Sequence, residues 1–222
     1  MKSCSLIVLA VLVGWLASGC RKDNAVVAGR TVGGDARKAL VGIRKGGDTN
    51  AYLVAASTYL ATNRDDAVAV DVMTCYARLR REAEFRAQGI AYATNSPSRL
   101  LEVVDIANNE TWGTMTAEFA RRVAQSPGAS FAELFRAVRF LADNGSDEGM
   151  EGFLERLASM AVKRYQKEDV DLLRGGLAIR RGTADDETAR TLSRLARDGM
   201  MPQVRREAAR LQTELQNKEK RQ

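Results

Sequence analysis

The sequence predicts an all-α protein made of stacked antiparallel helix pairs, with about ten to eleven helices. Three observations predict this class. From residue 35 onward, apolar residues recur every three or four positions, as in Met115, Phe119 and Val123. No comparable stretch alternates apolar and polar residues in the way that a half-buried strand does. Clusters of Gly, Asn, Ser and Pro interrupt the helical pattern at nearly regular intervals.

These interruptions divide the chain into the expected helices. Taken in pairs, the units begin near residues 35, 65, 96, 130, 167 and 200, so that they repeat about every 30–37 residues. Two-helix units at a near-constant period are typical of a stacked repeat, in which each unit buries its face against its neighbours. An irregular all-α domain has a similar helix density, and spacing alone leaves that alternative open. The expected helices are 35–45, 49–62, 65–79, 80–94, 97–108, 110–126, 130–143, 147–164, 168–181, 184–198 and 201–217.

Local signals mark several helix ends. A hydroxyl or carboxyl side chain that caps a helix start is often followed by Pro at the first helical position or by an acidic residue three positions on. Such starts are expected at Ser96-Pro97, at Ser130 with Glu133 and, more weakly, at Thr183 with Asp186. Glycines with a positive φ commonly end helices. We expect this role at Gly145, Gly182 and Gly199.

The last two expected helices carry the most specific pattern. Leucines on the first helix are followed by an Asp near the turn, then by Pro-x-Val-Arg and a pair of alanines on the second. This segment resembles a HEAT repeat. The resemblance covers roughly 30 residues and implies an α-solenoid that binds other proteins through a curved surface, without catalytic residues. The matching positions are Leu192, Leu195, Asp198, Pro202, Val204, Arg205, Ala208 and Ala209.

A second resemblance lies near the start of the helical region. Ala55, Ala56 and Tyr59, followed by Asn63, are similar to the first helix and turn of a tetratricopeptide repeat. The small residue that this family has on its second helix falls on Val68, which departs from the pattern. The resemblance implies the same kind of non-catalytic scaffold.

The N-terminus has the order of a secretory signal peptide. Lys2 precedes an apolar run from Leu6 to Leu16, and small residues follow. The run Leu16-Ala17-Ser18-Gly19-Cys20 resembles the bacterial lipobox, with Ala17 where that family most often has Leu. The resemblance implies cleavage between Gly19 and Cys20 and a diacylglycerol on Cys20. The chain is then expected outside the cytoplasm, lipid-anchored to a bacterial membrane at the outer membrane or cell surface, or on the periplasmic side.

Two alternatives stay open for this segment. Ordinary signal cleavage would expose Cys20 without lipid, and the 18 uncharged residues between Lys2 and Arg21 are near the lower limit for a membrane span. Both alternatives place the bulk of the chain outside the cytoplasm. The expected organisation is a signal peptide over 1–19, a lipidated Cys and flexible tether over 20–34, a helical-repeat domain over 35–217 and a disordered basic tail over 218–222.

Composition excludes several kinds of chemistry. The 222 residues include no His, which removes Ser-His-Asp and Cys-His nucleophiles and His-ligated zinc or haem. We expect no catalytic residue, no cofactor and no metal site. Cys75 is in helical register with Val68, Val72 and Leu79, so we expect a buried structural thiol. A lipid on Cys20 would leave Cys75 without a disulfide partner.

Acidic and glycine pairs have structural interpretations. Asp65-Asp66 and Asp185-Asp186 open expected helices, where carboxylates are favoured. The segment 143–153 superficially resembles a calcium loop, but Leu154 stands where that loop needs a Glu, so we expect a turn between helices. Gly33-Gly34, Gly46-Gly47 and Gly175-Gly176 lack the spacing of phosphate-binding loops. Within a helical pattern, Gly175-Gly176 indicates a close helix crossing or a break.

Basic clusters raise the question of nucleic-acid binding. The excess of 34 Lys and Arg over 28 Asp and Glu is small, and Glu residues interrupt the clusters. We therefore expect solvated helix faces with intrahelical ion pairs and no nucleic-acid partner. The clusters are Arg78 with Arg80, Arg81 and Arg86, then Arg180-Arg181 and Arg205-Arg206.

Together, these observations predict a membrane-anchored cell-envelope lipoprotein that acts as a non-catalytic protein-binding scaffold. The membrane is the partner through Cys20, and the protein partner and its binding residues are not identified by the sequence. The alternative is a hydrolase or a lipid- or glycan-handling protein that uses carboxylates without His, on an irregular helical fold.

Overall fold

The computed structural model describes residues 33–220. Within this range the chain forms eleven α-helices and no strand, which confirms the all-α prediction. The helices are α1 Gly33–Lys45, α2 Thr49–Leu60, α3 Asp66–Arg78, α4 Glu82–Ala93, α5 Pro97–Asn109, α6 Gly113–Gln125, α7 Phe131–Asp143, α8 Met150–Met160, α9 Arg164–Arg181, α10 Asp186–Asp198 and α11 Pro202–Glu219.

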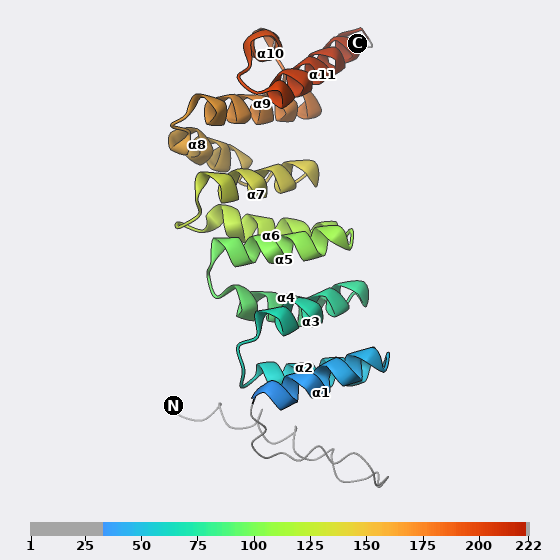
Figure 1. The fold of residues 1–222 in the computed structure, drawn as a ribbon. Coiled ribbons are helices and arrows are strands. Elements are labelled where there is room, and N and C mark those ends of the chain that lie inside the picture. The colour runs from blue at the N-terminus through green and yellow to red at the C-terminus, as the bar shows by residue number, and fades with distance from the viewer. Residues whose placement is uncertain (1–32, 221–222) are drawn as a thin grey trace, which may run out of the picture.

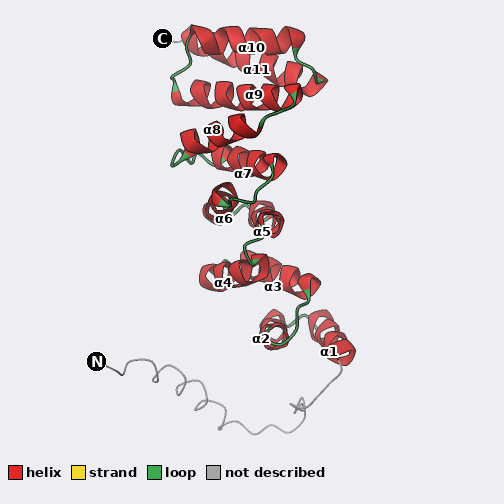
Figure 2. Cartoon of the chain, turned by 90° about the vertical axis from the view of Figure 1, so that its left-hand side faces the viewer, coloured by secondary structure: helices red, strands yellow, loops and turns green. Residues whose placement is uncertain are grey.

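Consecutive helices run antiparallel and stack upward from α1 to α11 (Figure 1). The odd-numbered helices all begin at one edge of the stack, where the loops between successive pairs also lie. We call this the start edge, on the left in Figure 1, and the opposite one the far edge. Figure 2 shows α1, α3 and α5 on one side of the stack and α2, α4 and α6 on the other. The described chain is therefore a solenoid of helix pairs.

The C-terminal unit departs from simple pairing. α10 and α11 pack as a close antiparallel pair, and α9 packs against both. This unit of three helices contains the segment that resembles a HEAT repeat, and both helices of that segment are present.

The buried side chains form two clusters. The larger runs from Leu40 on α1 to Leu177 on α9, and at its centre the ring of Phe85 lies 5.4 Å from Trp112 and 5.8 Å from Phe119. The smaller belongs to the last three helices and comprises Ile179, Leu192, Leu195, Val204, Ala208, Leu211 and Leu215. α9 contributes residues to both clusters, so it joins the two regions.

Arginines connect one helix pair to the next. The Arg86 guanidinium donates to both carboxylate oxygens of Glu118, at 3.0 Å, as well as to Glu82 on its own helix. The expected intrahelical pairing is confirmed at Arg86 with Glu82. The bridges between pairs add partners about one repeat apart in sequence, which become neighbours in space. Similar bridges, between residues 30 to 34 positions apart, join Arg78 to Glu110, Arg99 to Asp66, Arg136 to Asp105 and Arg181 to Asp147 and Glu151.

Two of the three expected helix starts are confirmed. Ser96 caps α5 before Pro97, and Ser130 and Glu133 form a reciprocal capping box at α7. The expectation for Thr183 was wrong. Asp185 caps α10 instead, because its carboxylate accepts from both the backbone N–H and the hydroxyl of the residue three positions on.

Two of the three glycines expected to end helices with a positive φ do so. Gly145 and Gly182 have φ of +69° and +71°, as expected. Gly199 has φ −58°, so the expected positive φ was wrong. It is required for space instead, since a Cβ there would lie 2.5 Å from the carbonyl oxygen of Leu195 and 3.2 Å from Val204.

The largest differences between the expected and the observed helix limits lie around residue 162. The helix expected over 147–164 is α8, which is shorter because Gly149 has φ +73° before it and the chain is extended after it. α9 begins four residues before the expected position. The Gln166 side chain accepts from the N–H groups of Val162 and Lys163 and so caps the new helix. At the C-terminus, α11 continues into the expected tail, where the Lys218 ammonium donates to the carbonyl of Ile179 at 2.7 Å.

Candidate binding groove between α7, α9 and α11

A groove of about 250 Å³ opens between α7, α9 and α11. These are three successive odd-numbered helices, and the groove lies where the three-helix unit meets the preceding pair. Its lining combines apolar side chains with both signs of charge. The lining residues are Phe135, Arg139 and Asp143 on α7, Asp169, Leu172, Leu173, Gly176 and Arg180 on α9, and Glu207, Arg210, Leu211 and Glu214 on α11.

The floor of the groove is apolar. Phe135 contributes a ring that stacks on Phe131 one turn earlier, with centroids 5.9 Å apart. Leu173 packs against the larger core cluster and Leu172 against the smaller one, so the floor spans the seam between them. Gly176 has no side chain to fill the space, and a Cβ there would lie 3.6 Å from Leu211. The glycine keeps the floor open.

The rim of the groove carries paired charges. Arg210 donates to Glu207 at 2.7 Å and to Glu214 at 3.3 Å. The Arg210 hydrogen bond lowers the pKa of the Glu207 carboxyl, so both groups are charged at neutral pH. Across the groove, Arg180 lies 3.5 Å from Asp143. These ion pairs are solvent-exposed and contribute little to stability, so their main effect is to define a polar border.

Asp169 differs from the other carboxylates of the groove. It accepts no hydrogen bond and forms no ion pair with any of the residues that the structure describes. Partial burial raises the pKa of its carboxyl above the usual value near 3.8, the neighbouring charge of Glu168 adds to the rise, and Arg139 opposes it. A carboxylate in this position would be stabilised by a cation or a hydrogen-bond donor from outside the chain.

The sequence contained one signal for this groove. The pair Gly175-Gly176 indicated a close helix crossing, and that is confirmed: a Cβ on Gly175 would lie 3.0 Å from Leu192 on α10. Gly175 faces Leu192 on α10 and Gly176 faces Leu211 on α11. The absence of both side chains lets α9 lie close to both helices. The lining residues on α7 and α11 were not identified, because nothing local indicates which helices meet across the groove.

The expected lipid-attachment residue Cys20 and the cleavage position after Gly19 lie outside the described residues. Cys75 is 3% exposed, which confirms the expected buried position. Burial raises the pKa of its thiol, and the charge of Arg44 opposes this only in part. The thiol is therefore protonated at neutral pH and lacks the exposure of a reactive cysteine.

The acidic pairs act as helix caps. Asp65 accepts from the N–H of Val68 at 3.2 Å and caps α3, as Asp185 does for α10. In the turn over 143–149 and the first turn of α8, Asp147 and Glu151 both pair with Arg181. These carboxylates have structural partners. Among residues 33–220, no three acidic or cysteine side chains gather closely enough to hold a metal ion.

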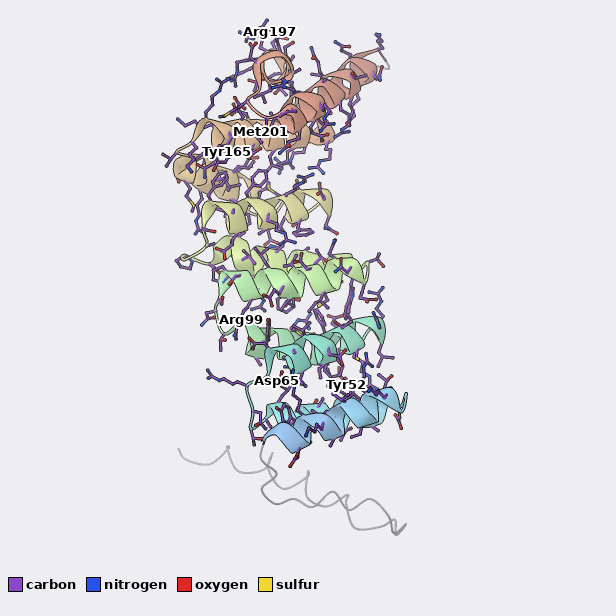
Figure 3. All side chains as sticks on the ribbon, viewed as in Figure 1. Tyr52, Asp65, Arg99, Tyr165, Arg197 and Met201 are labelled. Atoms are coloured by element: carbon purple, nitrogen blue, oxygen red, sulfur yellow. The ribbon has the colours of Figure 1, made fainter. Side chains whose placement is uncertain are left out.

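Tyr52 and Tyr59, which share a face of the second helix, do not form an exposed aromatic site. Tyr52, labelled in Figure 3, is 3% exposed. The Arg44 guanidinium lies 5.1 Å from the centroid of its ring. The hydroxyl of Tyr59 donates to Asp65 at 3.4 Å. Both side chains serve the packing of α1, α2 and α3.

No family model, no curated protein and no solved structure matches this chain. Of the helices in the described residues, none is long and apolar enough to cross a membrane.

Proposed function

We propose that the protein is a membrane-anchored lipoprotein of the bacterial cell envelope that binds a partner protein and catalyses no reaction. The anchor rests on the sequence, through the signal-like segment 1–19 and the lipobox-like run that ends at Cys20. The binding role is supported by the solenoid architecture, since stacked helix pairs present long surfaces that commonly hold other proteins.

The groove between α7, α9 and α11 is the observation that carries the binding role. An apolar floor between charged borders suits a short amphipathic segment, which places apolar residues on the floor and polar ones at the rim. Asp169 has no partner among the described residues and would accept a hydrogen bond from a Lys or Arg of that segment. The expected ligand is therefore a peptide segment with apolar anchors and at least one basic residue.

Site-specific photo-crosslinking in cells tests the binding role. A photoreactive amino acid in place of Arg139, which is 66% exposed at the rim, should give a discrete adduct with a partner. The matched control is Val54, which is 71% exposed on α2 and far from the groove. Adding Asp169→Lys should remove the Arg139 adduct through charge repulsion. Equal adducts from both positions, or an adduct that survives Asp169→Lys, would contradict binding in this groove.

Metabolic labelling with a fatty acid tests the anchor. The wild-type chain should incorporate label and remain with membranes, and Cys20→Ser should lose both properties while its circular dichroism still shows a helical protein. Cys75→Ser is the control, because a buried thiol in the core should have no part in anchoring. Label that persists in Cys20→Ser would exclude lipid at this residue.

A further inference from the structure

An exposed apolar patch lies at the start edge of the C-terminal unit. Val162 is 82% exposed, Met200 55%, Met201 39% and Tyr165 36%. They come from the α8–α9 loop, the first turn of α9 and the α10–α11 loop. Within residues 33–220, these four make up half of the large apolar side chains that are exposed. We call them the loop patch; Figure 3 labels Tyr165 and Met201.

The two loops of the patch are held together by a buried carboxylate. Glu168 is 2% exposed, and its Oε2 accepts the backbone N–H of Met200 at 2.7 Å. Its Oε1 accepts from Arg164 at 2.8 Å, and the same guanidinium donates to the carbonyl of Asp198 at 2.8 Å. These bonds tie the α10–α11 loop to the start of α9. Gln166 accepts from the N–H groups of Val162 and Lys163, so the backbone of the α8–α9 loop is held as well, while the apolar side chains of the patch are exposed. The patch is preorganised.

The charge around the patch is basic. Lys163 and Lys167 are exposed, and neither forms an ion pair with any described residue. The Lys163 ammonium lies 5.8 Å from the ring of Tyr165. At the far edge both signs of charge are present, since Arg181 pairs with Asp147 and Glu151. The start edge of the C-terminal unit therefore combines exposed apolar side chains with two lysines that have no ion-pair partner among the described residues.

The same edge receives the preceding part of the chain. α1 begins at the start edge with Gly33, as do all odd-numbered helices (Figure 1). Cys20 lies 13 positions earlier, and a segment of that length spans at most about 45 Å when fully extended. A lipid on Cys20 would therefore hold the first turn of α1 within about 45 Å of the membrane, at the other end of the stack from the patch.

We propose that the loop patch is a second membrane contact, which docks on a bilayer rich in anionic phospholipid. This inference rests on the proposed membrane anchoring for its setting. Exposed Met and Val side chains insert at the boundary between headgroups and acyl chains, Tyr is favoured at that depth, and neighbouring Lys residues attract anionic headgroups. The side chains of the patch are 36–82% exposed, and so they can reach a flat surface. Anchor and patch together lay the stack along the membrane.

Vesicle co-sedimentation tests the patch without the lipid anchor. The chain 21–222 lacks Cys20 and keeps every described helix. It should bind vesicles of phosphatidylcholine and phosphatidylglycerol, and bind pure phosphatidylcholine far more weakly. Met200→Asp with Met201→Asp should lower the partition coefficient about tenfold or more, because two apolar side chains no longer insert. Asp is compatible with the fold at 201, since Met201 is the N-cap of α11.

Charge reversal and a far-edge control complete the test. Lys163→Glu with Lys167→Glu should lower binding to the anionic vesicles about tenfold. Leu79→Asp, at a 47% exposed apolar position on the far edge, should change it less than about twofold. Circular dichroism checks that each variant stays helical.

Three results would overturn the proposal: no binding to anionic vesicles, equal binding to both vesicle types, or equal loss in Leu79→Asp. Sedimentation velocity without vesicles detects the rival occupant, a second copy of the chain. Self-association that the Met200 and Met201 variants abolish would reassign the patch to a dimer interface. Because the chain 21–222 carries no lipid site, failure here is separate from failure of fatty-acid labelling at Cys20.

Discussion

The two core clusters of the solenoid contain different kinds of side chain. Between Leu40 and Leu177, large rings fill the space between helix pairs, with Phe85, Trp112 and Phe119 in mutual contact. The seven residues of the C-terminal cluster include no aromatic side chain. There, two adjacent glycines on α9 bring three helices close together, and aliphatic side chains suffice.

This difference follows from what each region must pack. A repeat in the middle of a solenoid buries both faces against neighbours, and large rings reach across the gap between pairs. The terminal unit has a neighbour on one side only, so it closes on itself with α9, α10 and α11. α9 belongs to both regions, and the groove lies at that junction because the seam is filled less completely than either core.

The largest expected effect comes from removing a buried side chain in each region. Phe119→Ala should lower the free energy of unfolding by about 3–5 kcal/mol, and Leu195→Ala by about 2–3 kcal/mol, because each leaves a cavity. Hydrogen exchange should show faster opening throughout α3–α8 for Phe119→Ala and only within α9–α11 for Leu195→Ala. Uniform acceleration in Leu195→Ala would mean that the two regions unfold as one unit.

A methyl group added in the aromatic core should destabilise the protein. The Cβ of Gly89→Ala on α4 would lie 2.8 Å from Phe119 and 3.0 Å from Val103, and neither can move freely in a filled core. We expect a loss of about 1–3 kcal/mol, measured by urea denaturation. A neutral or stabilising result would show that the packing between α4, α5 and α6 is looser than the geometry indicates.

A methyl group added at Gly176, in the floor of the groove between the two core clusters, should instead stabilise the protein. The Cβ of Gly176→Ala would make an ordinary contact of 3.6 Å with Leu211, while Ala is the better helix former. We expect the free energy of unfolding to rise by about 0.5–1 kcal/mol. If Gly176→Ala destabilises the protein as Gly89→Ala does, the groove floor has no spare room.

The smallest expected effect depends on pH. Burial raises the pKa of Asp169 in the folded state above the value near 3.8 that it has when unfolded, so ionisation of this carboxyl opposes folding. Asp169→Asn should therefore raise the melting temperature at pH 7. The difference should shrink as pH falls through the folded pKa and vanish below about 3.8, where the carboxyl is protonated in both states. A constant difference across this range would exclude the titration of Asp169 as its cause.

The number, order and approximate limits of the helices could be predicted from the amino-acid sequence alone. Those features depend on interactions within a few residues, such as the cap at Ser96, the capping box at Ser130 and the positive φ of Gly145 and Gly182. Errors arose where several local signals competed and the sequence analysis followed the wrong one. Gly199 avoids a clash with its own helix and α11, and Gln166 starts α9 early.

Which residues contact one another between helix pairs could not be predicted without the three-dimensional arrangement of the helices. Arg86 pairs with Glu118 a full repeat away, Asp169 lines a groove completed by α7 and α11, and Glu168 accepts the backbone N–H of Met200 in the α10–α11 loop. Each of these neighbours depends on the angle and spacing between helix pairs, which many weak packing contacts set together. The periodicity of a single helix specifies the face that is buried, but not the partner against which it is buried.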